Sequence, residues 1–156
     1  MANLDLLMKA LDSAIWEMSE AFKGLPDEDV WKRPDPRLLS VGELAAHVAH
    51  WESVSFLGEG FESPLTGTAA HYYTTNVEKP YQLPMGADAV FSEVKRIHEA
   101  SKASFAGDPH DSEEKNPSRG GWSWGQTVEY QVFHIAYHTG QIYSVRHLLG
   151  HQTVDN

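Results

Sequence analysis

Two histidines one helical turn apart are the residues of this chain with the clearest chemical potential. His134 and His138 are separated by three residues, and positions i and i+4 of an α-helix lie on the same face. Two imidazoles placed in this way can bind one divalent metal ion. The same spacing is common without a metal, where each ring is exposed or hydrogen-bonded. The pair alone therefore leaves both interpretations open.

A stable catalytic site of the three-histidine type needs a third ligand, and the sequence offers three candidates. His47 ranks first, because it lies in the apolar stripe of a second segment with helical periodicity and so faces inward. His50 lies about 60° further around that helix and ranks second. His71, in a long segment without clear periodicity, ranks third. An inward histidine alone is more often a hydrogen-bonded core residue, so only the combination predicts a metal.

Three other kinds of site are excluded by the residues present. Zinc proteases of the His-Glu-x-x-His type have a glutamate directly after the first histidine, where this chain has Ile135. Di-iron carboxylate bundles need Glu-x-x-His pairs, and no glutamate of this sequence has a histidine three positions on. Because the chain contains no cysteine, thiolate ligands and a cysteine nucleophile are excluded as well.

Four segments with helical periodicity must position these histidines. They span about residues 3–22, 40–57, 86–105 and 123–149. Ser40 with Glu43 predicts a capping box at the start of the second segment, and Ser123 with Gln126 predicts another at the start of the fourth. No segment alternates as a strand does. The sequence therefore predicts an all-α four-helix bundle, organised as a single domain over residues 1–156.

The connections are too long for a minimal up-down bundle, so crossover connections are expected. Residues 58–84 show no clear period, and a structureless stretch of that length is uncommon in a compact domain. This segment is expected to contain a short helix or to cover the bundle as a lid. Residues 108–121 are expected to form a surface loop. Gly140, inside the fourth helix, is best explained by the close approach of a helix or ligand, with a neutral exposed position as the alternative.

Charge and hydropathy limit the classes of partner. With 12 basic and 22 acidic residues the net charge is −10, which argues against nucleic acid and anionic membranes. No window approaches ~18 consecutive apolar residues, so no membrane span is predicted. Charged residues interrupt the apolar residues at the N-terminus, unlike a signal peptide, and a cytoplasmic protein is expected.

The remaining aromatic and imidazole side chains have simpler interpretations. The tryptophans near the site are expected to be packing residues, namely Trp51, Trp122 and Trp124. The other histidines are expected to be solvent-exposed, namely His98, His110, His147 and His151.

Two stretches resemble the DinB/YfiT-like family of metal-binding proteins. These are LSVGELAAHVAHWE (39–52) and HIAYHTGQIYSVRHLLG (134–150), and LPDEDVWKRPDPRLLSVGE (25–43) resembles that family's approach to its second helix. The resemblance covers nearly the whole chain and is weakest over 58–84 and 108–121. It implies a four-helix bundle with up-down-down-up connectivity, often a homodimer. The family name refers to DNA-damage induction and implies no DNA binding.

The resemblance also implies a metal site with one histidine from the second helix and two from the fourth. Those positions match His47, His134 and His138 here. Zinc or nickel is commonly associated with the site, and water fills the rest of its shell. Relatives include thiol-dependent transferases and isomerases that use mycothiol or bacillithiol, while many members have no known activity.

Three classes of function follow. Three neutral imidazoles leave a divalent ion with an open position, which lowers the pKa of bound water to ~7 or ionises a substrate thiol. The sequence thus predicts a small-molecule metalloenzyme, either a transferase or isomerase using a low-molecular-weight thiol or a metal-dependent hydrolase. An enzyme should have a pocket under the long connection. The alternatives are a non-catalytic module with a closed fourth position, filled by His50 or His71, and a bundle without metal whose histidines bond one another.

Four further side chains near the pair could orient ligands or transfer protons. Spacing does not choose among these candidates, which are Glu129, Tyr130, Tyr137 and Gln141.

Overall fold

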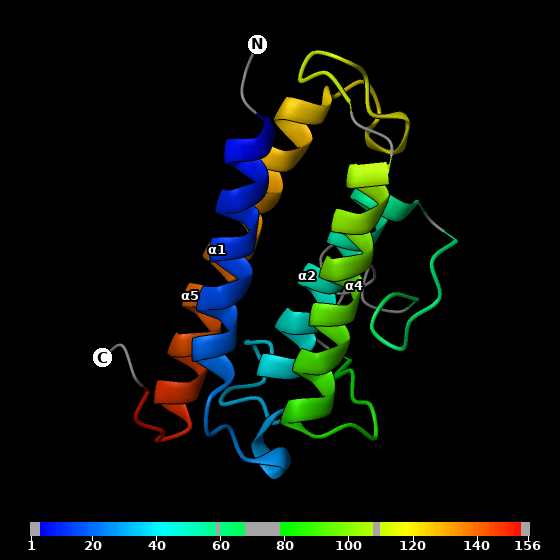
Figure 1. Ribbon diagram of the computed structural model, residues 1–156. Helices are drawn as coiled ribbons and strands as arrows, with labels where there is room; N and C mark the ends of the chain where they lie inside the picture. The colour runs from blue at the N-terminus through cyan, green and yellow to red at the C-terminus, as the bar shows by residue number, and fades with distance from the viewer. Residues whose placement is uncertain (1–3, 59, 68–78, 108–109, 154–156) are drawn as a thin grey trace.

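A computed structural model describes residues 4–58, 60–67, 79–107 and 110–153 of the chain, and within these ranges it is a four-helix bundle without β-strands (Figure 1). The long helices are α1 (Leu4–Phe22), α2 (Val41–Leu57), α4 (Ala87–Gly107) and α5 (Trp124–Leu148). Two short 3-10 helices lie in the connections, η1 (Asp27–Asp29) and η2 (Pro117–Arg119). The predicted all-α bundle is confirmed, and each predicted helix boundary lies within two residues of the observed one. None of the described helices is long and apolar enough to cross a membrane.

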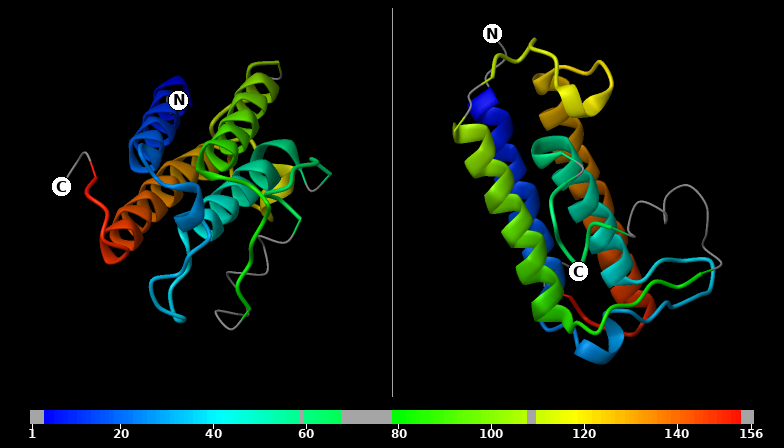
Figure 2. Two further views of the ribbon diagram at one scale, coloured as in Figure 1. Left: turned by 90° about the horizontal axis from the view of Figure 1, so that it is seen from below. Right: turned by 90° about the vertical axis from the view of Figure 1, so that its right-hand side faces the viewer.

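The helices form two parallel pairs that run in opposite directions. α1 packs beside α5 and α2 beside α4, and Figures 1 and 2 show that the chain direction is shared within each pair and reversed between them. α2 also packs against α5, so it touches two long helices and is buried on most of its surface. Polar side chains on α2 therefore lie in the interior, where each needs a partner.

The helices that carry the histidines begin at the predicted capping boxes. Ser40 Oγ accepts from the backbone N–H of Glu43 at 3.2 Å, and a Glu43 carboxylate oxygen accepts from the Ser40 N–H at 2.7 Å. Ser123 and Gln126 make the same reciprocal pair at 3.3 and 3.0 Å. Each box satisfies two amide donors that the first helical turn leaves unpaired. The starts of α2 and α5 are thus determined by residues three positions apart.

The connection before α2 is held by Trp31. Its indole N–H donates to the carbonyl of Met85 at 2.7 Å, and its ring lies on the backbone of Gly42. A Cβ at Gly42 would lie 2.6 Å from that ring, so a larger residue there would displace the tryptophan. This contact joins the start of α2 to the segment that leads into α4.

Several expectations about the connections and surfaces are wrong or remain open. The described parts of residues 58–84 contain turns and no helix, and the rest of that segment, with His71, lies outside the described residues. Gly140 is exposed and a Cβ there would meet nothing within 4 Å, so the expected close approach of another helix is wrong, and the observation favours the neutral alternative.

Of the four histidines expected to be exposed, one is exposed, two are partly buried and one is fully buried. His147 is exposed, and His110 and His151 are partly buried. His98 is only 2% exposed, because α4 turns it towards α1 and α2 and its ring is bonded on both sides there.

Candidate metal centre

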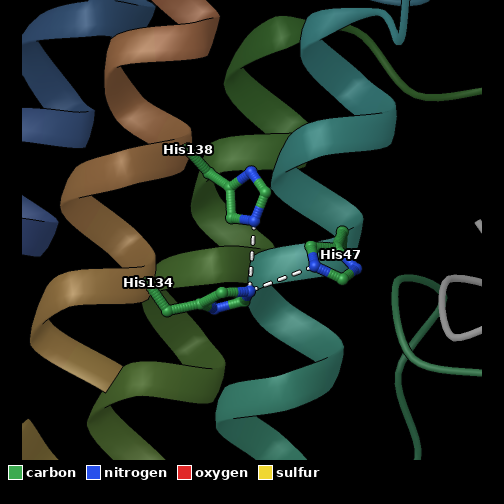
Figure 3. Close-up of side chains that lie close together, drawn as sticks. All are labelled: His47, His134 and His138. Carbon is green, nitrogen blue, oxygen red and sulfur yellow. Dashed lines mark hydrogen bonds between the residues drawn. The ribbon is translucent and has the colours of Figure 1, made fainter. Parts of the chain in front are cut away.

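Three buried histidine side chains converge between α2 and α5, and we call them the three-histidine cluster (Figure 3). His47 comes from α2, and His134 and His138 come from successive turns of α5. The Nε2 atom of His134 lies 3.0 Å from Nε2 of His47 and 3.1 Å from Nε2 of His138. The side chains offer one ligand atom each, all within 4.8 Å of one another. The sequence predicted these three residues, and the fold brings them together.

The register between α2 and α5 is held by side-chain amides. The amide nitrogen of Gln131 donates to the carbonyl of Trp51 at 3.2 Å and to the hydroxyl of Ser55 at 2.7 Å. Asn116, before η2, bridges the two helices, because its amide nitrogen donates to the carbonyl of Ser55 at 2.9 Å and to the hydroxyl of Thr127 of α5 at 3.3 Å. These bonds lie one to two turns from His47 along α2. They keep His47 opposite the histidine pair of α5.

Electrostatics keep the cluster neutral. Burial, together with repulsion from the neighbouring imidazoles, lowers the pKa of His47 to about 3. Burial also lowers the pKa of His134 to about 3, with further repulsion from His138 and Arg119. The pKa of His138 is lowered by burial, and its bond to Gln141 opposes the shift. A neutral imidazole has the lone pair that a metal ion requires, so the cluster is in the ligand form.

Hydrogen bonding among the rings does not account for both contacts. The Nε2 atom of His134 carries either one proton or one lone pair, so it makes one good hydrogen bond and not two. Nitrogens bound at ~2.0–2.1 Å around a tetrahedral ion are about 3.3 Å apart, close to the 3.0 and 3.1 Å found here. The donor set therefore fits a divalent ion such as zinc, with three neutral nitrogens as ligands.

One predicted candidate, Gln141, fixes the orientation of the His138 ring. The side-chain oxygen of Gln141 accepts from Nδ1 of His138 at 2.6 Å. This bond places the proton on Nδ1 and leaves the lone pair of Nε2 directed at the cluster. The Gln141 amide also reaches the hydroxyl of Tyr137 at 3.5 Å.

The other candidates differ in how close they come. The ring of Tyr130 stacks on His134 at 5.7 Å between centroids, and the ring of Tyr137 meets His138 edge-on at 5.1 Å. Glu129 is exposed and is not brought to the cluster. His50 packs on Trp51 at 5.2 Å and is not part of the converging group.

A cavity of about 260 Å³ reaches the cluster from one side. Among its lining residues are His47, His138 and Gln141. The rest are mostly apolar, namely Arg37, Leu38, Leu39, Leu44, Tyr137, Ser144, Val145 and Leu148. A pocket under the long connection of residues 58–84 was expected. The described part of that connection contributes no lining residue, and the segment before α2 forms the wall instead.

A family model of the DinB superfamily matches residues 10–142, which is most of the chain and includes all three histidines of the cluster. The chain belongs to the DinB superfamily. The resemblance seen in the sequence is thereby confirmed. No curated protein and no solved structure matches the chain significantly.

One charged residue near the centre of this DinB-superfamily protein was missed by sequence reasoning. Arg119, at the end of η2, is partly buried, and its guanidinium carbon lies 4.8 Å from the ring centre of Trp122 and 5.5 Å from that of Trp51. Burial lowers its pKa. Nothing in the polar segment 108–121 distinguished this arginine, because two of its aromatic neighbours, Trp51 and Tyr130, come from α2 and α5.

Proposed function

We propose that this DinB-superfamily protein is a small-molecule metalloenzyme that holds one divalent ion, zinc or nickel, on His47, His134 and His138. The observation that carries the proposal is the convergence of three buried, neutral Nε2 atoms beside a cavity. The three neutral nitrogens are a donor set that zinc and nickel accept. His50 packs on Trp51 outside the converging group, which supports an open fourth position rather than a closed one.

A divalent ion held by three neutral imidazoles keeps its positive charge and an open position, where it lowers the pKa of a bound thiol or water. The chain's own residues would orient the histidine rings and keep water away from a bound small molecule. Gln141 fixes the tautomer of His138, and Tyr130 covers one face of His134. Leucines on the cavity wall exclude water from a small-molecule ligand.

Transfer to or from a low-molecular-weight thiol is the reaction that the site supports best. No carboxylate belongs to the converging group or lines the described cavity, so a general base for activating water is missing from both. A thiol ionises more readily than water and needs no such base. The thiol proton leaves to solvent, and the sulfur forms a bond to an electrophilic carbon as that carbon loses its leaving group.

Elemental analysis of untagged protein tests the metal centre. We expect about one equivalent of zinc or nickel in the wild type and none in a folded His134→Ala/His138→Ala variant. His147→Ala is the matched control, because His147 is an exposed histidine of the same helix. Absence of metal from the wild type, even after reloading with zinc, nickel, manganese or iron, would overturn the proposal.

A second measurement tests the role of the thiol. Cobalt-loaded protein titrated with 2-mercaptoethanol should develop a sulfur-to-cobalt absorption band in the near ultraviolet. The same preparation is then assayed for thiol conjugation and for ester hydrolysis. Hydrolysis without the band would identify a hydrolase, and stable metal binding with neither activity would identify a non-catalytic metal-binding module.

A further inference from the structure

Arg119 differs from the other arginines of this chain in what its guanidinium contacts. The sequence has five arginines, and four of them place N–H groups on oxygen atoms. These are Arg33 on Glu43, Arg37 on Asp35, Arg96 on Glu93, and Arg146 on the carbonyls of Ala21 and Lys23. The guanidinium of Arg119 has no oxygen acceptor among the described residues and lies against aromatic rings.

Three rings surround this guanidinium, and no oxygen atom of the described residues accepts from its N–H groups. Its carbon lies 4.8, 5.5 and 5.7 Å from the ring centres of Trp122, Trp51 and Tyr130. Rings over the faces of a guanidinium interact with its charge, but they do not accept from the five in-plane N–H groups. The Arg119 side chain is partly buried, and none of its nitrogens is among the buried polar atoms without a partner, so its N–H groups can be reached from solvent. An oxyanion would supply both the charge and the acceptors.

The rings that hold Arg119 also touch the three-histidine cluster. Tyr130 stacks on His134 with the centroids 5.7 Å apart, and Trp51 faces His47 at 6.5 Å. One layer of aromatic rings therefore separates the guanidinium from the metal ligands. Arg119 does not line the cavity of about 260 Å³, so a small molecule bound at Arg119 would approach the centre from the side of η2.

The loop that carries Arg119 is anchored to the bundle. Asn116 is only 1% exposed, and its side chain accepts from the Ser118 N–H at 2.8 Å, which caps η2. Its amide nitrogen donates to Ser55 of α2 and to Thr127 of α5. The guanidinium is therefore held in place before any ligand arrives, which is the arrangement that binding sites need.

We propose that Arg119 binds the carboxylate of the small molecule on which the three-histidine centre acts. This inference rests on the proposed function for the identity of the centre, whereas the anion site itself stands on the contacts of Arg119. The planar guanidinium matches a carboxylate with two parallel hydrogen bonds. A single cation in a chain of net charge −10 suits a monoanion better than a phosphate dianion. The surrounding rings suit a carboxylate attached to an apolar or aromatic body.

Nuclear magnetic resonance of uniformly ¹⁵N-labelled full-length protein tests the inference directly. Benzoate and benzamide, which share shape but differ in charge, are titrated at constant ionic strength into metal-free and zinc-loaded protein. We expect benzoate, and not benzamide, to shift the Nε–H signal of Arg119 and the indole signals of Trp51 and Trp122 saturably. Arg119→Gln should weaken benzoate binding by at least about tenfold, the effect of losing hydrogen bonds to a charged group. Arg119→Lys keeps the positive charge but loses the pair of parallel N–H donors, so it should weaken benzoate binding less than Arg119→Gln does.

Arg96→Gln is the matched control, because Arg96 also lies over an aromatic ring but is already paired with Glu93. The control should bind benzoate as the wild type does.

Equal responses to benzoate and benzamide, or unchanged binding in Arg119→Lys and in any folded Arg119→Gln, would overturn the inference. Inorganic phosphate binding as tightly as benzoate would overturn the carboxylate assignment. If benzoate binds to a protein that takes up no metal, the anion site is supported and the proposed function is refuted. If the protein takes up metal but does not respond to benzoate, the proposed function is supported and the anion site is refuted.

Discussion

Two buried groups that contain histidine lie on different sides of α2, and they differ in the charges around their imidazole rings. The three-histidine cluster faces α5 and includes no carboxylate. On the side facing α4 and α1, His98 is bonded through Nδ1 to Glu52 at 2.7 Å and through Nε2 to Asp12 at 2.9 Å. Lys102 pairs with the same Asp12 at 2.8 Å. We call these four residues the His98 network.

The comparison shows that burial alone does not decide the charge of a histidine. Burial lowers the pKa of His47 and of His98 alike. At His98 the hydrogen bonds and charges of Glu52 and Asp12 outweigh burial and raise the pKa above its usual value. The neutral form is thereby favoured in the cluster, whereas the charged form is favoured at His98.

α2 separates the two environments through its own geometry. His47 and Glu52 are five residues apart, which places them about 140° apart around the helix. One is presented to α5 and the other to α4, and both are at most 2% exposed. A single helix can therefore carry a neutral ligand and a buried carboxylate without bringing them together.

The largest effect is expected when the carboxylate that distinguishes the His98 network from the three-histidine cluster is removed. Glu52→Ala should lower the free energy of unfolding by about 3–5 kcal/mol, because it leaves a buried imidazolium without its main partner. Urea unfolding of the metal-free protein at pH 6 measures this. Glu129→Ala, an exposed helical glutamate, is the control and should change stability by less than about 0.5 kcal/mol. Equal effects of the two substitutions would show that the His98 network is not electrostatically important.

The two groups should respond to pH with opposite signs. The lowered pKa of about 3 at His47 and His134 means that the unfolded chain takes up protons below pH ~6.5 and the folded chain does not. Stability therefore falls as the pH drops, by up to about 1.4 kcal/mol per pH unit for each histidine. The raised pKa of His98 contributes stability that is full below pH ~6.5 and is lost as the pH rises through its folded value.

Unfolding curves of chelator-treated protein between pH 4.5 and 8 separate these contributions. His47→Gln should flatten the acid side of the profile, and His98→Gln should remove the loss on the alkaline side. If both variants change the same side of the profile, the assignment of opposite charges to the two groups is wrong.

A smaller effect is expected when the hydrogen-bond partner of His138 in the three-histidine cluster is removed. Gln141→Ala should weaken metal binding by about 10- to 100-fold, since the ring of His138 loses the acceptor that fixes its tautomer. Competition with a metallochromic chelator measures the affinity. Ser144→Ala, one turn further along α5, is the control and should leave the affinity unchanged. Equal affinities in the two variants would show that Gln141 does not orient the ligand.

The smallest expected effect provides a baseline for both groups. Gly140→Ala should stabilise the protein by about 0.5–1 kcal/mol, because alanine favours the helix and its Cβ meets no neighbour. Thermal or urea unfolding measures the gain. Metal affinity and the pH profile should stay as in the wild type, and a change in either would mean that Gly140 is coupled to the cluster.

Features that depend on a few neighbouring residues could be predicted from the sequence. The ends of α2 and α5 follow from capping boxes three residues long, and the shared face of His134 and His138 follows from their spacing of four. The inward position of His47 follows from the apolar stripe around it. Each is a property of one helix, set by the period of 3.6 residues per turn. Whether the cluster holds a metal stays a prediction.

The tertiary structure decided everything that depends on which helices meet. His98 looked exposed in the sequence, since its partners lie 46 and 86 positions away in α2 and α1. Arg119 looked like an ordinary loop residue, because the rings that enclose it come partly from other elements. The part of the cavity wall that Arg37, Leu38 and Leu39 form was not expected from the sequence. Charge, burial and hydrogen bonding act through space, and periodicity along a helix carries no information on the partner that the opposite helix will bring.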